Sequence, residues 1–376
     1  GNYVTFLHTR LAIIDLDPRA NQPFERANVA LTYNGEIYNY IEVRDELLMR
    51  GHSFTTQSDT EVLVAAYKEW GAGFLDKLDG MWAFALFDMD HGEVLLSRDR
   101  FGEKPLYTWI LDGTLYFASE VKTLEALTGR MADVNVQQLR RFLVNGYKCL
   151  GKSGQTYFQG IDLFPAGHCA LLARPERPAT APYWALPTAI HETTFEDAVA
   201  ETRRLLTRAV ETRMRADVPL AFCLSGGVDS ATLAAIAAKQ MGRDIHCFSI
   251  IDSDERYDES ANIDTMVRHL GCQHHQVHTS TEGFFERLRA QVKMHDAPVV
   301  TISYYMHAFL SEAIADAGYK IALSGTAADE IFTGYYDHYS MWLAGMHSQP
   351  GVDFDALVDE WKSGMGAHVQ NPGLQD

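Results

Sequence analysis

The feature that most constrains the fold of this sequence is a glycine-containing turn between an apolar run and an alanine-rich run. Residues 220–224 favour a buried strand, residues 225–230 read Ser-Gly-Gly-Val-Asp-Ser, and residues 230–241 favour a helix. Adjacent glycines let backbone N–H groups converge on an anion, and a helix N-terminus adds partial positive charge there. The turn is therefore predicted to bind phosphate, with Asp229 acting through Mg²⁺. A plain strand-to-helix turn, with Asp229 as an ordinary first-turn acid, is the alternative.

Strand-like and helix-like segments alternate through the rest of the second half. This order is typical of a parallel sheet with helices on its faces, which is an α/β fold. A helix should begin after Thr194, because the sequence Thr-Phe-Glu-Asp at residues 194–197 resembles a capping box. The expected strands are residues 219–224, 245–251, 274–278 and 320–323, and the expected helices are residues 194–215, 230–241, 260–270 and 303–317.

A second polar turn has the same placement as the first. The strand expected at residues 320–323 ends in residues 324–330, which read Ser-Gly-Thr-Ala-Ala-Asp-Glu, and an apolar helix should start at Ile331. Ligands bind where the carboxyl ends of parallel strands meet at one edge of a sheet. We therefore expect Asp329 to face Asp229 across one site and to share its metal ion. Alone, the second turn would be structural; together with the first, it favours a nucleotide site.

The first half has a different pattern, in which short strand-like runs are interrupted by two amphipathic helices. A tight hairpin is expected at residues 111–114, where Asp-Gly separates two strand-like runs. The expected strands are residues 3–8, 29–33, 81–87, 94–97, 105–110 and 115–118, and the expected helices are residues 40–49 and 60–70. The best linker candidate is the proline-containing stretch at residues 173–179, followed by Pro182, and the expected domains are residues 1–185 and 190–376.

Composition excludes several classes of protein. The 376 residues are 47% hydrophobic and 22% charged, which is typical of a globular protein with two or three domains. No run approaches the about 18 apolar residues of a membrane helix, and the start does not resemble a signal peptide. The formal charge of −18 argues against nucleic acid as a partner. The five cysteines form no CxxC pair, so reduced thiols and a cytoplasmic protein are expected.

A competing phosphate motif lies at residues 146–153, which match the P-loop pattern GxxxxGK[ST] completely. That loop needs a strand before it and a helix after it. Residues 137–144 favour a helix, and residues 154–158 do not begin one. A P-loop is therefore not the preferred interpretation.

A cluster of potential metal ligands consists of Cys272, His274, His275 and His278. In a strand, His274 and His278 point to one face and His275 points to the other. A structural role is therefore preferred over a metal site.

With these motifs, the chain resembles the asparagine synthetase family over essentially its whole length. The second half is similar to the family's synthetase domain, a pyrophosphate-loop ATPase. The resemblance implies that ATP and Mg²⁺ convert aspartate into an acyl-adenylate, from which ammonia displaces AMP. Asp229 and Asp329 would hold the Mg²⁺ on the pyrophosphate. The nucleotide-binding residues that the resemblance implies are Leu224, Ser225, Gly226, Gly227, Asp229, Ser230, Ile250, Ser324 and Gly325.

The first half resembles the family's glutaminase domain, an N-terminal-nucleophile hydrolase built as an α-β-β-α sandwich. Arg10 matches the arginine that binds the glutamine carboxylate, and Asp59 matches the acid that takes the α-ammonium group. The stretch that supplies the oxyanion hole and substrate contacts corresponds to Asn34, Gly35 and Glu36. Residues 97–107 add a further matching motif.

Each of these matches has a simpler explanation. Arg10 could be a surface charge, and Asn34-Gly35 is a strong hairpin-turn dipeptide. Residues 58–61 also read as a capping box that would begin a helix. The family spacing of all three features together favours the glutamine site.

The chain departs from the family in three places. The family's nucleophile is an N-terminal cysteine, whereas residue 1 is glycine and the first cysteine is Cys149, so we expect the glutaminase nucleophile to be absent from this chain. The sequence ends at Asp376, before the region where relatives complete the synthetase site, so truncation at both ends is expected. Thr326 stands at the position of the family's adenylate-forming acid.

These observations predict a glutamine-dependent asparagine synthetase that belongs to asparagine biosynthesis. Glutamine and aspartate are the expected small-molecule partners, neither nucleic acid nor a membrane is expected, and a homodimer is the candidate assembly. The nearest competing prediction is a related amidotransferase that amidates another carboxylate, such as a uronic acid in surface-polysaccharide biosynthesis. A P-loop NTPase and a protein that only binds glutamine or nucleotide compete less strongly.

Overall fold

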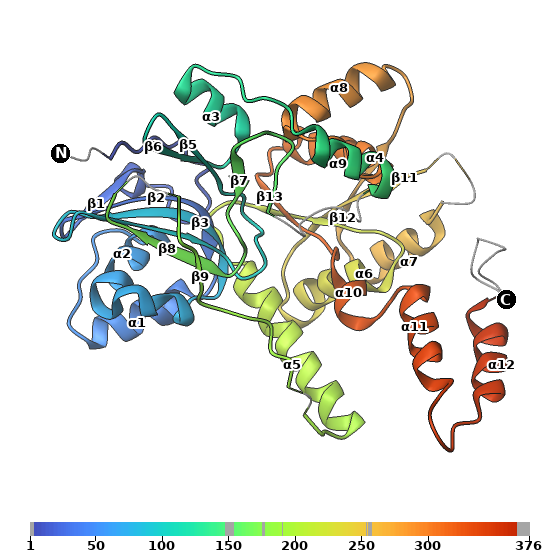
Figure 1. Ribbon diagram of the computed structural model, residues 1–376. Coiled ribbons are helices and arrows are strands. Elements are labelled where there is room, and N and C mark those ends of the chain that lie inside the picture. The colour runs from blue at the N-terminus through green and yellow to red at the C-terminus, as the bar shows by residue number, and fades with distance from the viewer. Residues whose placement is uncertain are drawn as a thin grey trace. The chain divides into compact units, whose positions relative to one another are not determined.

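The computed structural model describes residues 4–146, 154–174, 177–189, 191–252, 254 and 258–366. The chain divides into two compact units, each built from separate stretches of sequence (Figure 1). The first unit consists of Gly1–Ala221, Ile250–Tyr257 and Gln276–Ala322, and the second consists of Phe222–Ser249, Asp258–His275 and Leu323–Asp376. The domain boundary at residues 185–190 stays a prediction.

The first unit contains an antiparallel sheet that is covered on both faces. Along β3 (Gly80–Asp88), Trp82 and Phe84 belong to the apolar cluster on one face, whereas Ala83 and Ala85 belong to the cluster on the other. This alternation follows from the two-residue period of a strand. The strands in spatial order are β1 (Phe24–Arg26), β2 (Val29–Ile37), β3, β4 (Glu93–Arg98), β8 (His168–Leu172) and β9 (Ala181–Pro182).

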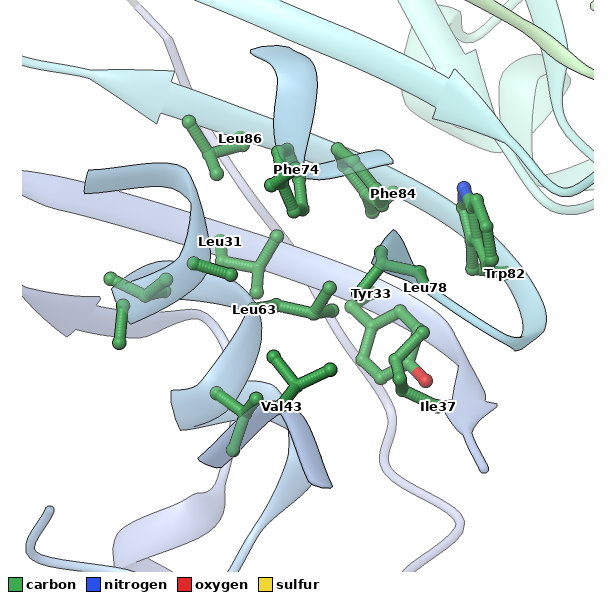
Figure 2. Packing of buried hydrophobic residues seen from close by; sticks show 14 of the residues in the cluster. Leu31, Tyr33, Ile37, Val43, Leu63, Phe74, Leu78, Trp82, Phe84 and Leu86 are labelled. Carbon is green, nitrogen blue, oxygen red and sulfur yellow. The ribbon is translucent and has the colours of Figure 1, made fainter. Parts of the chain in front are cut away.

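Helices cover the face that carries the larger side chains. These helices are α1 (Tyr40–Met49), α2 (Asp59–Trp70) and the short 3-10 segment η2 (Gly71–Lys77). Figure 2 shows the resulting core, whose buried side chains include Leu31, Tyr33, Val43, Leu63, Phe74 and Phe84. Full burial of one such aliphatic or aromatic side chain contributes about 1.5–3 kcal/mol. The cluster therefore holds the helices firmly against β2 and β3.

A second antiparallel sheet covers the opposite face. Its strands in spatial order are β6 (Thr114–Ala118), β5 (Tyr107–Leu111) and β7 (Ile161–Leu163). Phe117 of β6 joins the cluster of Ala83 and Ala85, so the two sheets pack face to face. Helix α3 (Val121–Thr128) covers the outer face by packing Leu124 with Trp109. The predicted α-β-β-α sandwich is thus confirmed.

Among the predicted elements of this sandwich, the hairpin is confirmed and one strand is wrong. Asp112 and Gly113 connect β5 to β6, and their φ angles of 50° and 75° suit a tight hairpin turn. Residues 4–13 form neither strand nor helix, so the strand predicted at residues 3–8 is wrong. The apolar side chains there contribute to packing instead, because the ring of Phe6 lies edge-on to that of Phe117 with centroids 6.0 Å apart.

The predicted helix cap at Thr194 is confirmed in the first unit. The Thr194 hydroxyl oxygen accepts the Asp197 N–H at 3.1 Å and begins α5 (Phe195–Arg213). The remaining described elements of this unit are η1 (Pro18–Ala20), α4 (Val136–Asn145), α8 (Phe284–His295) and α9 (Ile302–Asp316). Helices α3 and α8 were not predicted.

A parallel sheet follows the sandwich along the chain, as the alternating pattern predicted. Its strands in spatial order are β12 (Gln273–His278), β11 (His246–Ile251), β10 (Leu220–Cys223) and β13 (Ile321–Leu323). Successive strands β10, β11 and β12 extend the sheet in one direction, whereas β13 lies on the other side of β10. The strand order therefore reverses between β10 and β13, which is where parallel sheets bind ligands.

The helices of the second unit are α6 (Val228–Ala235), the π-helical turn η4 (Ile236–Gln240), α7 (Ser260–Leu270), α10 (Ala328–Phe332), α11 (Tyr336–Met346) and α12 (Phe354–Gly364). The helix start predicted at Ile331 is wrong, because α10 already begins at Ala328. Asp329 and Glu330 lie in its first turn, where acidic side chains interact favourably with the helix dipole. None of the helices in the described part of the chain is long and apolar enough to cross a membrane.

Candidate functional sites

A cavity of about 1330 Å³ lies in the first unit, and it brings together the residues proposed for glutamine binding. Arg10, Asn34, Gly35, Glu36 and Asp59 all line it. Its volume exceeds the about 300–1,000 Å³ of an ordinary ligand pocket. The structure thus places these side chains around one space, although they come from three separate segments of the sequence.

The Asn34-Gly35-Glu36 stretch lies inside β2, so its interpretation as a hairpin turn is wrong. Gly35 is opposite Trp82 of β3, and a Cβ atom on Gly35 would lie only 2.8 Å from the Trp82 Cα and against the Met81 carbonyl oxygen. This close approach requires glycine. The Asn34 amide donates to the Ser119 hydroxyl at 3.3 Å.

Asp59 is a buried carboxyl group in the first turn of α2. Its Oδ2 accepts the Tyr33 hydroxyl at 2.9 Å and the Ile37 N–H at 3.0 Å. Burial raises the pKa of Asp59, while these two hydrogen bonds oppose the rise. The capping interpretation is also confirmed, because the Ser58 hydroxyl accepts the Glu61 N–H at 3.2 Å. The cap therefore fixes the residue that we propose to contact substrate.

Glu36 is the second buried carboxyl group of the cavity. Burial and the neighbouring Asp59 charge raise the pKa of Glu36 to about 7, against the influence of Lys104. Within the described residues, Glu36 Oε1 has no hydrogen-bond partner. A buried acceptor without a partner is costly, so this oxygen is well suited to receive a cationic or N–H group of a ligand.

The guanidinium group of Arg10 is already engaged by the loop that follows it. Its Nη2 donates to the carbonyl oxygens of Ile14, at 2.9 Å, and Asp15. Its Nη1 donates to the Asp17 carbonyl and the Asn21 side chain, both at 3.2 Å. A carboxylate that binds Arg10 must therefore approach Nε or compete with these acceptors. The sequence did not predict that Arg10 holds the loop of residues 14–21 in place.

The motif at residues 97–107 forms a rigid loop beside the cavity. Buried Asp99 accepts the N–H groups of Glu103 and Lys104, both at 2.9 Å. Arg98 donates to the carbonyls of Gly102 at 2.6 Å and Lys104 at 2.7 Å. The loop thus holds Lys104 at the cavity, which it lines. The sequence signal for this loop was the resemblance of residues 97–107 to the family motif.

The predicted phosphate turn follows β10 and has a dense internal hydrogen-bond network. Ser225 donates its N–H to the Ser230 hydroxyl at 3.0 Å, and the two hydroxyls lie 2.8 Å apart. Gly227 N–H donates to Ser225 Oγ at 3.2 Å. Gly226 N–H donates to the carboxylate of Glu259 at 3.0 Å, a contact that sequence reasoning missed. The N–H groups that we expect to bind phosphate are therefore held by side chains of the chain itself.

The second polar turn lies directly against the first. A Cβ atom on Gly325 would be 2.7 Å from the Ser230 nitrogen and 3.0 Å from the Asp229 Cβ, so the two loops touch at a position that tolerates only glycine. Thr326 is exposed, and its hydroxyl lies 2.8 Å from that of Ser324. The reversal of strand order between β10 and β13 explains why loops about 100 residues apart in sequence meet here.

The remaining predicted members of the nucleotide site lie in or after these strands. Leu224 is buried directly after β10, and Ile250 is half-buried in β11. Asp329 lies in α10, five residues after Ser324. In the described part of the chain, no group of three or more His, Cys, Asp or Glu side chains gathers as a metal site. Mg²⁺ binding by Asp229 and Asp329 stays a prediction.

The competing motifs lack the context that they require. Residues 147–153 of the P-loop match lie outside the described residues, but helix α4 precedes them where a strand is needed. Residues 154–158 then form no helix. His274, His275 and His278 lie on β12 as predicted. The cysteines at positions 169, 223, 247 and 272 are free thiols, and Cys149 lies outside the described residues.

Two family models match the chain in comparisons with known proteins. Residues 1–184 match a family described as a glutamine amidotransferase domain, and residues 201–372 match one described as asparagine synthase. A putative glutamine-hydrolysing asparagine synthetase 2 of Methanocaldococcus jannaschii is 30% identical over 352 residues, covering 88% of this chain and 67% of the relative.

Two further relatives are an asparagine synthetase and a protein named as an amidase. Asparagine synthetase 3 of Bacillus subtilis is 32% identical, with 89% of this chain and 56% of the relative covered. A protein of Penicillium rubens named amidase chyE is 32% identical, with 93% of this chain and 53% of the relative covered. The chain thus spans about half the length of these two relatives.

Proposed function

Because the chain belongs to the glutamine-hydrolysing asparagine synthetase family, we propose that it is part of an ATP-dependent amidotransferase. In the complete protein, glutamine would be hydrolysed to glutamate and ammonia in the first domain. ATP would convert a carboxylate into an acyl-adenylate and pyrophosphate in the second. Ammonia would then form the amide and release AMP and a proton.

The observation that carries this proposal is the contact of the two strand-end loops. Gly325 lies against Asp229 and Ser230 at the point where the order of the parallel strands reverses. In this proposal a pyrophosphate group would take the place of the Glu259 carboxylate on the Gly226 N–H. The Ser324 hydroxyl at the start of the second loop would add a further donor. A nucleoside triphosphate is the class of ligand that these donors would bind.

Asp229 and Asp329 would be the residues that hold a Mg²⁺ ion together with phosphate. Both are carboxylates in the first turn of a helix that begins at the site, and Mg²⁺ is commonly held by one or two carboxylates plus substrate phosphates. When bound, the ion would neutralise negative charge on the pyrophosphate. The two aspartates would help to orient the phosphate chain through the ion.

The glutamine site would use the charges of the cavity. The carboxylates of Glu36 and Asp59 would bind the α-ammonium group, and Arg10 would bind the glutamine carboxylate from the cavity wall. Gly35 N–H and the Asn34 amide would stabilise the oxyanion that forms when the amide is attacked. Buried charges are favourable only when paired, which explains why Glu36 and Asp59 would select a substrate with an ammonium group.

Aspartate is the acceptor that we propose first, with asparagine as the product of the complete enzyme in the cytoplasm. A second candidate is another carboxylate, such as a uronic acid in surface-polysaccharide biosynthesis. Thr326 favours this second candidate, since it replaces the acid that the family typically carries there. The relative named an amidase shows that sequences this similar also carry names different from asparagine synthetase.

The test is an assay of the complete protein with ATP, Mg²⁺, glutamine and aspartate. Formation of AMP, pyrophosphate and asparagine in equal amounts would support the first candidate. Formation of AMP only with a different carboxylate would support the second. Release of ADP would indicate a P-loop NTPase, and nucleotide binding without any AMP would indicate a binding protein. Either of the last two results would contradict the proposal.

A further inference from the structure

A hydrogen-bond chain crosses the second unit from β12 to the start of the nucleotide loop. His274 Nε2 lies 2.9 Å from the Ser249 hydroxyl, and that hydroxyl donates to the Leu224 carbonyl at 2.6 Å. The three residues belong to β12, β11 and the end of β10, which are neighbouring strands. This series of hydrogen bonds therefore ends at Leu224, one residue before Ser225, the first residue of the loop.

The direction of each hydrogen bond follows from the number of protons. Ser249 has a single hydroxyl proton, and the Leu224 carbonyl receives it. Toward His274 the same oxygen can only accept, so Nε2 must carry a hydrogen. Burial lowers the pKa of His274, which favours the neutral imidazole, and the hydrogen bond to Ser249 selects the tautomer with a hydrogen on Nε2. Ser249 is 1% exposed, so its hydroxyl has no access to bulk water that could replace either partner.

The Leu224 backbone is held on both of its polar groups. Its N–H donates to the Phe248 carbonyl at 2.9 Å, and its carbonyl accepts from Ser249. The regular strand β10 ends at Cys223, and at the next residue the Ser249 hydroxyl donates to the carbonyl in place of a backbone N–H. The position of the Leu224 carbonyl sets the peptide plane of the Ser225 N–H, which contacts Ser230 at 3.0 Å.

We propose that His274 is a positioning residue of the nucleotide site, acting through Ser249 and Leu224 on the Ser225 amide. This inference rests on the proposed ATP-dependent function and identifies how the phosphate loop is held in register. His274 would not contact the nucleotide. Instead, its Nε2–H keeps the Ser249 hydroxyl turned toward the Leu224 carbonyl, so that the loop begins at a fixed point.

The neighbouring histidine has a different role, which argues against a shared metal site. The ring of His275 stacks on that of Phe248, with centroids 4.4 Å apart and planes 10° apart. It also stacks on His246 at 5.9 Å. These contacts lie on the face of β12 opposite to His274. One histidine thus packs the strands together, while the other continues the polar chain.

The experiment measures ATP binding and acceptor-dependent pyrophosphate–ATP exchange in the complete protein. His274→Ala and Ser249→Ala should each raise the Kd and KM for ATP by about threefold to tenfold, the range for loss of one hydrogen bond. The Kd and KM for ATP of the double variant should be no higher than those of either single variant, because both substitutions interrupt the same series of hydrogen bonds. His274→Gln should restore ATP binding, since its amide N–H can replace Nε2–H. His278→Ala, at an exposed position of the same strand, is the matched control and should match the wild type.

The KM for glutamine and the melting temperature separate positioning from general damage. Both should stay near the wild-type values in His274→Gln, and the KM for glutamine should stay so in His274→Ala. If the wild-type protein shows no ATP-dependent exchange, the proposed function fails. If the wild type is active and the ATP constants of His274→Ala are unchanged, or if ATP and glutamine constants rise together, the positioning role is overturned while the function stands.

Discussion

Glu36 and Asp59 are two buried carboxyl groups on the same cavity, and burial together with the Asp59 charge raises the pKa of Glu36 to about 7. Two carboxylates that line one cavity without a cation between them are unfavourable, because each resists ionisation of the other. A bound ammonium group would remove this cost. The affinity of the cavity for a cationic ligand should therefore depend on the pH of the solution.

The first prediction concerns pH and stability. The pKa of Glu36 in the folded chain lies above its ordinary value of 4.5, so its contribution to stability is present below pH 4.5 and is lost as the pH rises through about 7. Relative to the wild type, Glu36→Gln should gain on the order of 3 kcal/mol of stability between pH 4.5 and pH 8. Chemical unfolding of both proteins at the two pH values measures this difference. Equal pH dependence in the two proteins would contradict it.

The same group should control glutamine binding in the complete protein. Glutamine affinity should fall as the pH drops below about 7, because protonated Glu36 no longer attracts the ammonium group. Calorimetric titration with glutamine at several pH values measures this dependence. The Glu36→Gln variant should bind glutamine weakly, and its affinity should not change with pH near 7.

A second prediction tests the role of Asp59. Asp59→Ala removes the buried counter-charge of the ammonium group, so glutamine binding should weaken by several kcal/mol, as in other buried ion pairs. The matched control is Tyr33→Phe, which removes the 2.9 Å hydrogen bond to Asp59 but keeps the charge. Its effect should be much smaller. An unchanged KM for glutamine in Asp59→Ala would disprove the assignment.

The third prediction uses the close packing of β2 against β3. Gly35→Ala places a methyl group against the Met81 carbonyl and 2.8 Å from the Trp82 Cα, both backbone atoms that cannot move aside cheaply. It should destabilise the chain by about 3 kcal/mol or more, as overpacking does at its upper range. Gly73→Ala, with no atom within 4 Å of the added methyl group, should change stability by less than about 1 kcal/mol. Urea unfolding of the two variants provides the comparison, and equal losses would contradict it.

Local patterns predicted much of the fold because they depend on neighbouring residues. The cap at Thr194 and the Asp112-Gly113 turn need only a few adjacent side chains, and both are present. Residues 3–8 had strand composition, but composition does not tell whether a partner strand is available. Phe6 packs on Phe117 without joining a sheet.

The long-range parts of the sites were harder to predict. The two strand-end loops were expected at one edge of the sheet, but their direct contact depends on strand order, which sequence periodicity does not encode. Gly325 reaches Asp229 only because β13 lies beside β10. Glu259 and Ser249 likewise contact the loop region from separate elements, and no local motif marks either of them.

The fourth prediction separates the two phosphate motifs. In the complete protein, Asp229→Asn should abolish formation of AMP and pyrophosphate, because the proposed Mg²⁺ site loses a charged ligand. Lys152→Ala should leave the activity nearly intact, because the flanks of residues 146–153 do not have the structure of a P-loop. Rates of pyrophosphate release measure both effects. The reverse pattern would restore the P-loop interpretation.

The last prediction concerns Thr326 and the identity of the acceptor. Thr326 follows Ser324 and Gly325 in the second loop, and its exposed hydroxyl lies 2.8 Å from the Ser324 hydroxyl. An acid at this position could bind the incoming amine or take its proton as ammonia attacks. Threonine donates a hydrogen bond but is no base near neutral pH.

If that acid matters for aspartyl-adenylate chemistry, the complete enzyme should use aspartate poorly and a sugar acid better. Thr326→Glu should then increase aspartate-dependent pyrophosphate–ATP exchange, because it supplies the missing carboxylate. Thr326→Val is the matched control, since it removes the hydrogen bond to Ser324 without adding an acid, and it should not increase the exchange. The assay compares aspartate with a panel of uronic acids for all three proteins. Wild-type exchange with aspartate at the rate of ordinary asparagine synthetases would refute the idea and leave Thr326 as a tolerated variation.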